Sequence, residues 1–269
     1  MKNRPHLRLL RQGNQRWDAW RSSQTLKQVD LTEISIRGER FHGMDLRWVK
    51  LNRAYLDYAD LRWADFRFAE LVDASLIGTN LSEANLSEAN LIGSELREAK
   101  FLGADLTGVN LVGTQLWRTQ LQHTDLASAQ LHRACLVESS LMDANLADAD
   151  LTSAVLNQVE ANGTHAYRAN FSQARLIRSH FVNAYLFAAN FGGADLAGSD
   201  FGWANLTKAN FAGANLRGVN LRGAKVADVN FMGADLRGAC LRDVELSEAQ
   251  LQAVGWMDSP EELARRRFC

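Results

Sequence analysis

The chain is organised by an apolar residue at every fifth position from Leu31 to Leu251. These 45 positions, called centres below, include 32 Leu and nine Phe. The remaining four centres are Ile36, Ala161, Ala166 and Val226. A strict period of five fits neither an α-helix nor a coiled coil, which repeat every ~3.6 and ~3.5 residues. The pattern therefore predicts one continuous repeat domain.

A second register lies two residues before each centre and holds 26 Ala, seven Val, five Thr and four Ser. Because side chains alternate along an extended segment, the centre and this small residue should both point inward. Asp or Asn fills the position between them in 22 of 45 pentads, and 15 of the 19 glycines fall two residues after a centre. Glycine accepts backbone angles that turns require. Each pentad thus predicts a short extended segment followed by a turn.

The strings Ala-Asn-Leu-Ser-Glu-Ala-Asn-Leu at 84–91 and Ala-Asp-Leu-Arg-Gly-Ala at 234–239 resemble the pentapeptide-repeat family. The resemblance implies an all-β solenoid, namely a right-handed four-sided β-helix with four pentads per coil. The 45 pentads would then form about 11 coils and a rod about 50 Å long. A 20-residue coil also predicts a stacked column of Phe171, Phe191, Phe211 and Phe231, faced by Phe181 and Phe201 from the opposite wall.

The repeat is expected to span residues 29–253, preceded by an N-terminal helical cap over 1–28. Trp17 and Trp20 lie three residues apart on one face of that cap, where they can cover the open end of the core. One internal segment, 157–170, departs from the pattern because its two centres are alanines and it contains an Asn-Gly turn signal. A loop of ten residues would keep the five-residue phase, so the sequence allows either a loop or a thin coil here.

Residues 254–269 should form a C-terminal capping helix. Ser259 to Glu262 read as a capping box with proline at the first helical position, which predicts a helix over about 260–268. By resemblance to the quinolone-resistance members of the family, this end is also a candidate site of homodimerisation. The apolar residues of that candidate dimer end are Trp256, Met257, Leu263 and Phe268.

Composition argues against catalysis and against polyanion binding. Lys plus Arg number 30 and Asp plus Glu number 31, so the net charge is −1. The six histidines have no partners at metal-ligand spacing, and catalytic or phosphate-cradling motifs are absent from the sequence. A core filled by Leu and Phe leaves no substrate pocket. We expect no enzymatic activity, no cofactor, no metal and no direct nucleic-acid binding.

Nowhere in the chain do about 18 apolar residues follow one another, and the N-terminus carries no apolar run of signal-peptide length. We expect a soluble, cytoplasmic protein that does not enter the membrane.

Aligned aromatic, apolar and arginine residues on the outer walls are the candidates for protein binding. With a 20-residue coil, one column contains Ile77, Arg97, Trp117, Val137, Asn157 and Ile177, flanked by Arg118, Arg175 and Arg178. Two further candidate pairs are Trp48 with Phe68 and Tyr167 with Phe187.

These observations favour a non-enzymatic solenoid that presents a rigid wall to another, unidentified protein. The resemblance offers an alternative, a DNA mimic that binds DNA gyrase or topoisomerase IV. A mimic needs a strongly acidic wall. The most acidic wall, which contains Asp45, Asp65 and Asp105, holds nine acidic against five basic residues, which is mild for that role. A third alternative is a structural scaffold without a tight partner.

Overall fold

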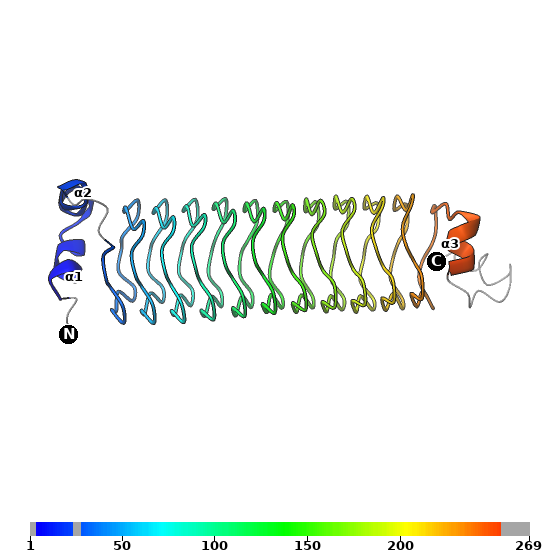
Figure 1. Ribbon diagram of the computed structural model, residues 1–269, viewed down its shortest axis with the longest axis horizontal. Coiled ribbons are helices and arrows are strands. Elements are labelled where there is room, and N and C mark those ends of the chain that lie inside the picture. The colour runs from blue at the N-terminus through cyan, green and yellow to red at the C-terminus, as the bar shows by residue number, and fades with distance from the viewer. Residues whose placement is uncertain (1–3, 24–27, 254–269) are drawn as a thin grey trace.

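The computed structural model describes residues 4–23 and 28–253. It is an elongated rod of stacked coils with helices at its two ends (Figure 1). Helices α1 (Arg4–Leu10) and α2 (Asn14–Ser23) cover the N-terminal end, and α3 (Glu248–Ala253) lies at the C-terminal end. Between them the chain forms a β-helix solenoid whose strands are reduced to single bridged residues.

Each pentad repeats the same local structure, as residues 116–120 illustrate. Leu116 and Thr119 are buried, Trp117 and Arg118 form the turn, and Gln120 is the bridged residue on the surface. The centre and the small residue therefore point inward, as the alternation predicted. The buried hydroxyl of Thr119 donates to the carbonyl oxygen of Leu96 (3.0 Å), so this polar atom enters the core with its hydrogen bond made.

Neighbouring coils are joined in parallel, with each bridged residue paired to the residue 20 positions further on, from Asp30 with Lys50 to Asn220 with Cys240. The backbone hydrogen bonds follow the same register. The N–H of Leu116 donates to the carbonyl of Cys135 (2.7 Å), and the N–H of Gln120 donates to the carbonyl of Ala99 (3.0 Å). Residues 20 apart therefore stand in one column along the rod.

Columns of leucine and phenylalanine fill the core. Phe171, Phe191 and Phe211 stack with ring centroids 4.8 Å apart and planes within 5°. Phe181 and Phe201 form the facing stack (5.1 Å) and meet the first column edge to face. The two predicted phenylalanine columns are confirmed. Each buried centre stabilises the fold by about 1.5 to 3 kcal/mol before chain entropy is subtracted.

The segment 157–170 is a thin coil, not a loop. Ala161 and Ala166 are fully buried at the centre positions. The bridges Glu160 with His180 and His165 with Tyr185 keep the 20-residue register through the segment. The columns before and after it are therefore continuous.

Side chains of α2 satisfy backbone carbonyls of the first coil. Asn14 Nδ2 donates to His42 O (2.7 Å) and Trp17 Nε1 to Asp45 O (2.6 Å). Arg21 donates in the same way to Arg47 O (2.6 Å). In the body of the rod, such carbonyls accept from the backbone of the preceding coil. The cap therefore replaces the donors of a missing coil and covers an open sheet edge.

At the other end, the repeat stops earlier than the boundary of 253 predicted from the pattern. The five-residue phase runs to Leu251, but α3 begins at Glu248 because Ser247 and Gln250 form a capping box. Gln250 Nε2 then donates to the carbonyls of Val226 (2.8 Å) and Val229 (3.1 Å). The side-chain amide of Gln250 therefore caps the N-terminus of α3 and also satisfies two backbone carbonyls of the last coil.

The predicted helix over 260–268 and the candidate dimer end (Trp256, Met257, Leu263, Phe268) lie outside the described residues. Across residues 4–23 and 28–253, no helix combines the length and apolarity that a membrane crossing requires.

The turn glycines generate a test with an internal control. Gly213 and Gly223 both have φ near +65°, but open space surrounds Gly213, whereas the Trp203 ring lies against Gly223 where a Cβ would be. Gly213→Ala should lose only the left-handed penalty of about 1 to 2 kcal/mol. Gly223→Ala should lose more free energy of unfolding, measured in urea, because the added Cβ meets the Trp203 ring. If the ring moves aside instead, the indole NMR signal of Trp203 should shift. Equal losses with an unmoved Trp203 signal would contradict this packing.

Candidate protein-binding surface

The structure separates the predicted surface residues into two edges of the rod. Trp48 and Phe68 occupy the second turn position of their pentads, and Tyr167 and Phe187 occupy the adjacent first position. These four residues form one edge, called the Trp48 edge. The other candidates form the Trp117 edge, which is ten residues, or half a coil, away: Ile77, Arg97, Trp117, Arg118, Val137, Asn157, Arg175, Ile177 and Arg178. One flat partner cannot cover both edges.

The N-terminal part of the Trp48 edge is an exposed aromatic stack. The rings of Trp48 and Phe68 lie 4.2 Å apart at an angle of 11° and are 44% and 40% exposed. Both residues have φ near +60°, and this turn conformation directs the two rings outward one above the other. The stack orders the rings before any partner arrives.

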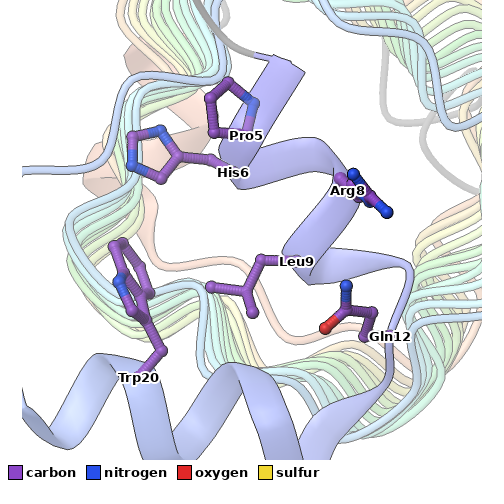
Figure 2. Close-up of a pocket in the computed structure, with 6 residues that line it drawn as sticks. All are labelled: Pro5, His6, Arg8, Leu9, Gln12 and Trp20. Atoms are coloured by element: carbon purple, nitrogen blue, oxygen red, sulfur yellow. The ribbon is translucent and has the colours of Figure 1, made fainter.

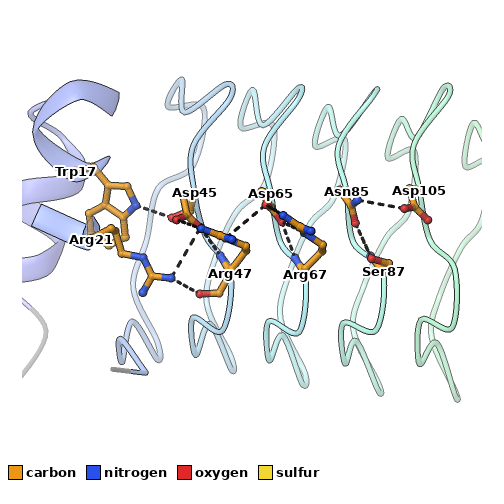
Figure 3. Close-up of polar contacts among 9 residues, drawn as sticks. All are labelled: Trp17, Arg21, Asp45, Arg47, Asp65, Arg67, Asn85, Ser87 and Asp105. Atoms are coloured by element: carbon orange, nitrogen blue, oxygen red, sulfur yellow. Dashed lines mark hydrogen bonds and ion pairs between the residues drawn. The ribbon is translucent and has the colours of Figure 1, made fainter. Parts of the chain in front are cut away.

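Two arginine–aspartate pairs precede these residues in the sequence and are shown in Figure 3. Arg47 donates to both carboxylate oxygens of Asp45 (2.8 Å each). Arg67 pairs with Asp65 in the same way (2.9 and 2.6 Å). Such two-point pairs fix the guanidinium planes. The same Asp-centre-Arg spacing forms the pairs Asp60 with Arg62 and Asp235 with Arg237.

Asp45 also connects this surface to the cap. Burial by itself raises the pKa of Asp45, but hydrogen bonds from Arg47 and the charges of Arg21 and Arg47 outweigh it. The pKa of Asp45 therefore lies below its usual range. The nitrogen of Arg21 stands 3.8 Å from the Asp45 carboxylate. The arrangement keeps Asp45 ionised.

The C-terminal part of the Trp48 edge is a second aromatic cluster. Tyr167 and Phe187 stack at 5.8 Å, and Tyr185 lies 6.4 Å from Phe187 with a nearly parallel ring. Arg168 stands over Tyr167 (5.9 Å) and Lys208 over Phe187 (5.6 Å). Aromatic side chains and arginine are enriched in protein interfaces.

The Trp117 edge carries no stacked pair of aromatic rings within residues 4–23 and 28–253. Trp117 is 48% exposed and donates through Nε1 to the sulfur of Cys135 (2.6 Å), while Ile77, Val137 and Ile177 are half-buried. Arg118 pairs with Glu138 (2.7 Å). The apolar candidates of this edge mostly pack against the rod itself.

Among the described residues, sequence reasoning missed four exposed aromatic side chains, Tyr55 (45% exposed), Tyr58 (66%), Trp63 (56%) and Trp203 (54%). Tyr58, Trp63 and Trp203 stand two residues after a centre, the position that Trp48 also occupies, and Tyr55 is a bridged residue, so the pentad register could have found them. Trp63 contacts Arg62 (5.1 Å) and the His42 ring (6.5 Å) at the turn that precedes Phe68 on the same coil.

An open pocket of about 720 Å³ lies in the N-terminal cap (Figure 2). The rings of His6 and Trp20, 5.1 Å apart, form one side of it together with Leu9. Its lining carries no carboxylate, thiol or hydroxyl group that could act as a nucleophile or base beside His6. Among the described residues, no three His, Cys, Asp or Glu side chains gather as metal ligands.

Comparison with known protein families decides the identity of the repeat. The matching family model is described as pentapeptide repeats, with eight copies, and the matched residues are 45–82, 74–113, 104–143, 139–183, 184–223 and 214–252. The chain belongs to the pentapeptide-repeat family.

Several solved structures of pentapeptide-repeat proteins are similar to this one. HetL, involved in heterocyst differentiation regulation in the cyanobacterium Nostoc sp. strain PCC 7120, is 28% identical over 86% of this chain and 97% of its own, with a TM-score of 0.40. A protein of the Arabidopsis thaliana thylakoid lumen is 33% identical over 39% of this chain and 70% of its own (TM-score 0.29). QnrB1, a plasmid-mediated fluoroquinolone resistance protein, is 18% identical over 84% of this chain and 97% of its own (TM-score 0.35). A search of curated proteins gives no match.

In this pentapeptide-repeat protein the cap beside the Trp48 edge carries a pH-sensitive carboxyl group. Burial and the neighbouring charge of Asp45 raise the pKa of Asp18, and its Oδ1 is buried without a hydrogen-bond partner. A raised folded-state pKa means that ionised Asp18 opposes folding above that pKa. The free energy of unfolding should therefore rise as the pH falls through the folded-state pKa of Asp18.

We predict that Asp18→Asn raises the Tm at pH 7, by a few degrees at most, because it removes a carboxylate held near Asp45. The difference from the unsubstituted chain should shrink at an acidic pH, because protonation of Asp18 removes the unfavourable charge in the folded chain. Thermal melts at the two pH values check this. A Tm difference that is the same at both would show that the charge of Asp18 is not the cause.

Proposed function

We propose that this chain is a non-enzymatic pentapeptide-repeat solenoid that presents a rigid wall to another protein. In this proposal the solenoid is a right-handed, four-sided rod of about 11 coils, and the Trp48 edge is its binding surface. The supporting observation is that two ordered aromatic clusters, Trp48 with Phe68 and Tyr167 with Phe187, stand on one edge.

Order before binding favours this role. Immobilising a flexible side chain at an interface costs about 0.5 to 1.5 kcal/mol, and the stacked rings of Trp48 and Phe68 have already lost that freedom. The coils beneath them are fixed by backbone hydrogen bonds on both sides. From Trp48 to Lys208 the edge spans eight coils, or about 38 Å. Two clusters at a fixed separation select for a partner with matching sites.

The Trp48 edge is preferred to the Trp117 edge because its exposed aromatic rings are stacked in pairs. Trp48, Phe68, Tyr167 and neighbouring Tyr185 are each between 38% and 45% exposed. In the columns of the Trp117 edge, Tyr55, Tyr58 and Trp117 are 45%, 66% and 48% exposed, but no ring stack joins them to another aromatic residue of 4–23 or 28–253. Binding hot spots are enriched in Trp, Tyr and Arg, which the Trp48 edge supplies together.

The test is quantitative affinity enrichment from the native lysate, comparing the unsubstituted chain with the double variant Trp48→Ala/Phe68→Ala. Trp117→Ala is the matched control, since it removes an equally exposed indole from the other edge. We expect at least one protein to be retained by the unsubstituted chain and the control but to drop about tenfold or more with the double variant. Identical retention by all three would contradict binding at the Trp48 edge. No specific retention by any would favour a scaffold without a tight partner.

A DNA-mimicking role against gyrase or topoisomerase IV has one observation in its favour. Asp105 and Asp125 are consecutive bridged residues that carry like charges, and Thr107 and Ala127 stand where Arg47 and Arg67 stand on other coils. This acidic stretch is short. Arginines neutralise Asp45 and Asp65 on the same wall, and Arg168 contacts Asp148 (3.2 Å).

We therefore predict no inhibition of gyrase supercoiling and no protection from quinolones at submicromolar protein, because a cleft built for phosphates needs a continuous acidic surface. Supercoiling assays with the purified chain measure this directly. Inhibition that is lost in Asp105→Asn/Asp125→Asn would show that the short acidic stretch is enough.

A further inference from the structure

Two consecutive bridged carboxylates, Asp105 and Asp125, form no ion pair with any residue of 4–23 or 28–253. Like charges directly opposite each other destabilise a sheet. Asp45 and Asp65 stand in the same column, and there Arg47 and Arg67 neutralise the pair. At Asp105 and Asp125 the protein supplies only amides, since Asn85 Nδ2 donates to Asp105 (3.1 Å) and Asn145 Nδ2 to Asp125 (3.0 Å). One column thus contains a neutralised pair and a pair that lacks counterions.

The surroundings of Asp105 and Asp125 are acidic as well. From Ser82 to Asp148 the wall and its two bounding turns contain no Lys or Arg. We call this surface the acidic face, and its carboxylates are Glu83, Glu88, Asp105, Asp125, Asp143 and Asp148. Asp148 contacts Arg168, and Asp143 lies 4.0 Å from His123. The other four carboxylates form no ion pair within the described parts of the chain.

Half a coil away, the opposite wall is basic. We call it the basic face; from Val112 to Arg178 it contains one acidic residue, Glu138, and the arginines Arg118, Arg133, Arg175 and Arg178. Arg118 pairs with Glu138. Arg133, Arg175 and Arg178 are exposed, and no ion pair joins them to any residue of 4–23 or 28–253. The rod therefore carries unmatched charges of opposite sign on opposite walls.

We propose that copies of this chain associate side by side, with the acidic face of one rod against the basic face of the next. Each face supplies the counterions that the other lacks, and a rod wall of bridged residues is regular enough for a second one to lie along it. Apolar side chains occur among the charges on both faces, Trp117 and Ile177 on the basic one and Ala127 and Ala147 on the acidic one.

The overall charge permits this contact. A net charge of −1 gives little long-range repulsion between copies. Because the two faces differ, the contact is heterologous and extends into rows of rods instead of closing as a dimer. Association by complementary charges weakens as salt screens them, since the Debye length falls from about 30 Å at ~10 mM to about 3 Å at ~1 M ionic strength.

Sedimentation velocity of the full chain at these two ionic strengths tests the proposal. The unsubstituted chain should form oligomers in low salt that dissociate in high salt. Two charge-reversed variants, Asp105→Lys/Asp125→Lys and Arg175→Glu/Arg178→Glu, should each associate at least about tenfold more weakly in low salt. An equimolar mixture of these two variants should recover association, because each then meets the opposite sign on its partner.

Arg40→Glu/Lys100→Glu is the control. It makes the same change in net charge as Arg175→Glu/Arg178→Glu in the column of Arg40, Asp60, Asn80 and Lys100, on a wall between the two faces, and it should associate like the unsubstituted chain. Trp48→Ala/Phe68→Ala should also leave self-association unchanged, which separates this proposal from binding at the Trp48 edge. Circular dichroism melts establish that the variants are folded. A monomer in low salt, or a mixture that fails to associate although both variants are folded, overturns the proposal. Oligomers that the charge reversals do not weaken also overturn it.

Discussion

Backbone hydrogen bonding between successive coils is the constraint on which the rest of the structure depends. In the body of the rod, each pentad directs the N–H groups of its centre, its second turn residue and its bridged residue to neighbouring coils, as Leu116, Arg118 and Gln120 illustrate. A fourth, that of Thr119, closes the turn onto Leu116. Buried backbone groups must be paired, so this register cannot slip locally without leaving several of them unsatisfied. The register also decides which side chains share a column.

The turns show how strongly the ladder constrains the chain. Within residues 4–23 and 28–253, twenty-eight non-glycine residues adopt positive φ, a conformation that costs most side chains about 1 to 2 kcal/mol. They persist because the hydrogen bonds and the buried centres on both sides of each turn favour one geometry. Ladder edges at the two ends receive side-chain donors, from Asn14, Trp17 and Arg21 at one end and from Gln250 at the other.

The interior was predictable from the sequence because it repeats a single local rule. The inward pair of each pentad and the phenylalanine columns follow from alternation and a 20-residue coil. The thin coil at Ala161 was not decidable, since a ten-residue loop keeps the same phase. The end of the repeat at Ser247 could not be predicted from the apolar pattern, because Leu251 continues that pattern. The helix that replaces the repeat depends on the polar residues Ser247 and Gln250.

The candidate surface was less predictable. Which residues share a column follows from the register, and Trp48 with Phe68 was found in this way. The Asp45–Arg47 ion pair could not be predicted from the register, because it depends on the conformation of the Arg47 side chain. The lack of a cation at Asp105 is recognised only when Asp105 is compared with Asp45 and Asp65 in the same column.

Amide hydrogen exchange tests the ladder most directly. Along the described coils, the N–H of the residue after a centre has no backbone acceptor, as at Leu102 and Trp117, whereas at Ser82 and Ser87 an asparagine side chain accepts it. The account predicts a five-residue period in which Leu102 and Trp117 exchange fast between slow neighbours, with Ser82 and Ser87 slower than either. Protection of Trp117 equal to that of Leu116 and Arg118, or exchange without a period of five, would contradict it.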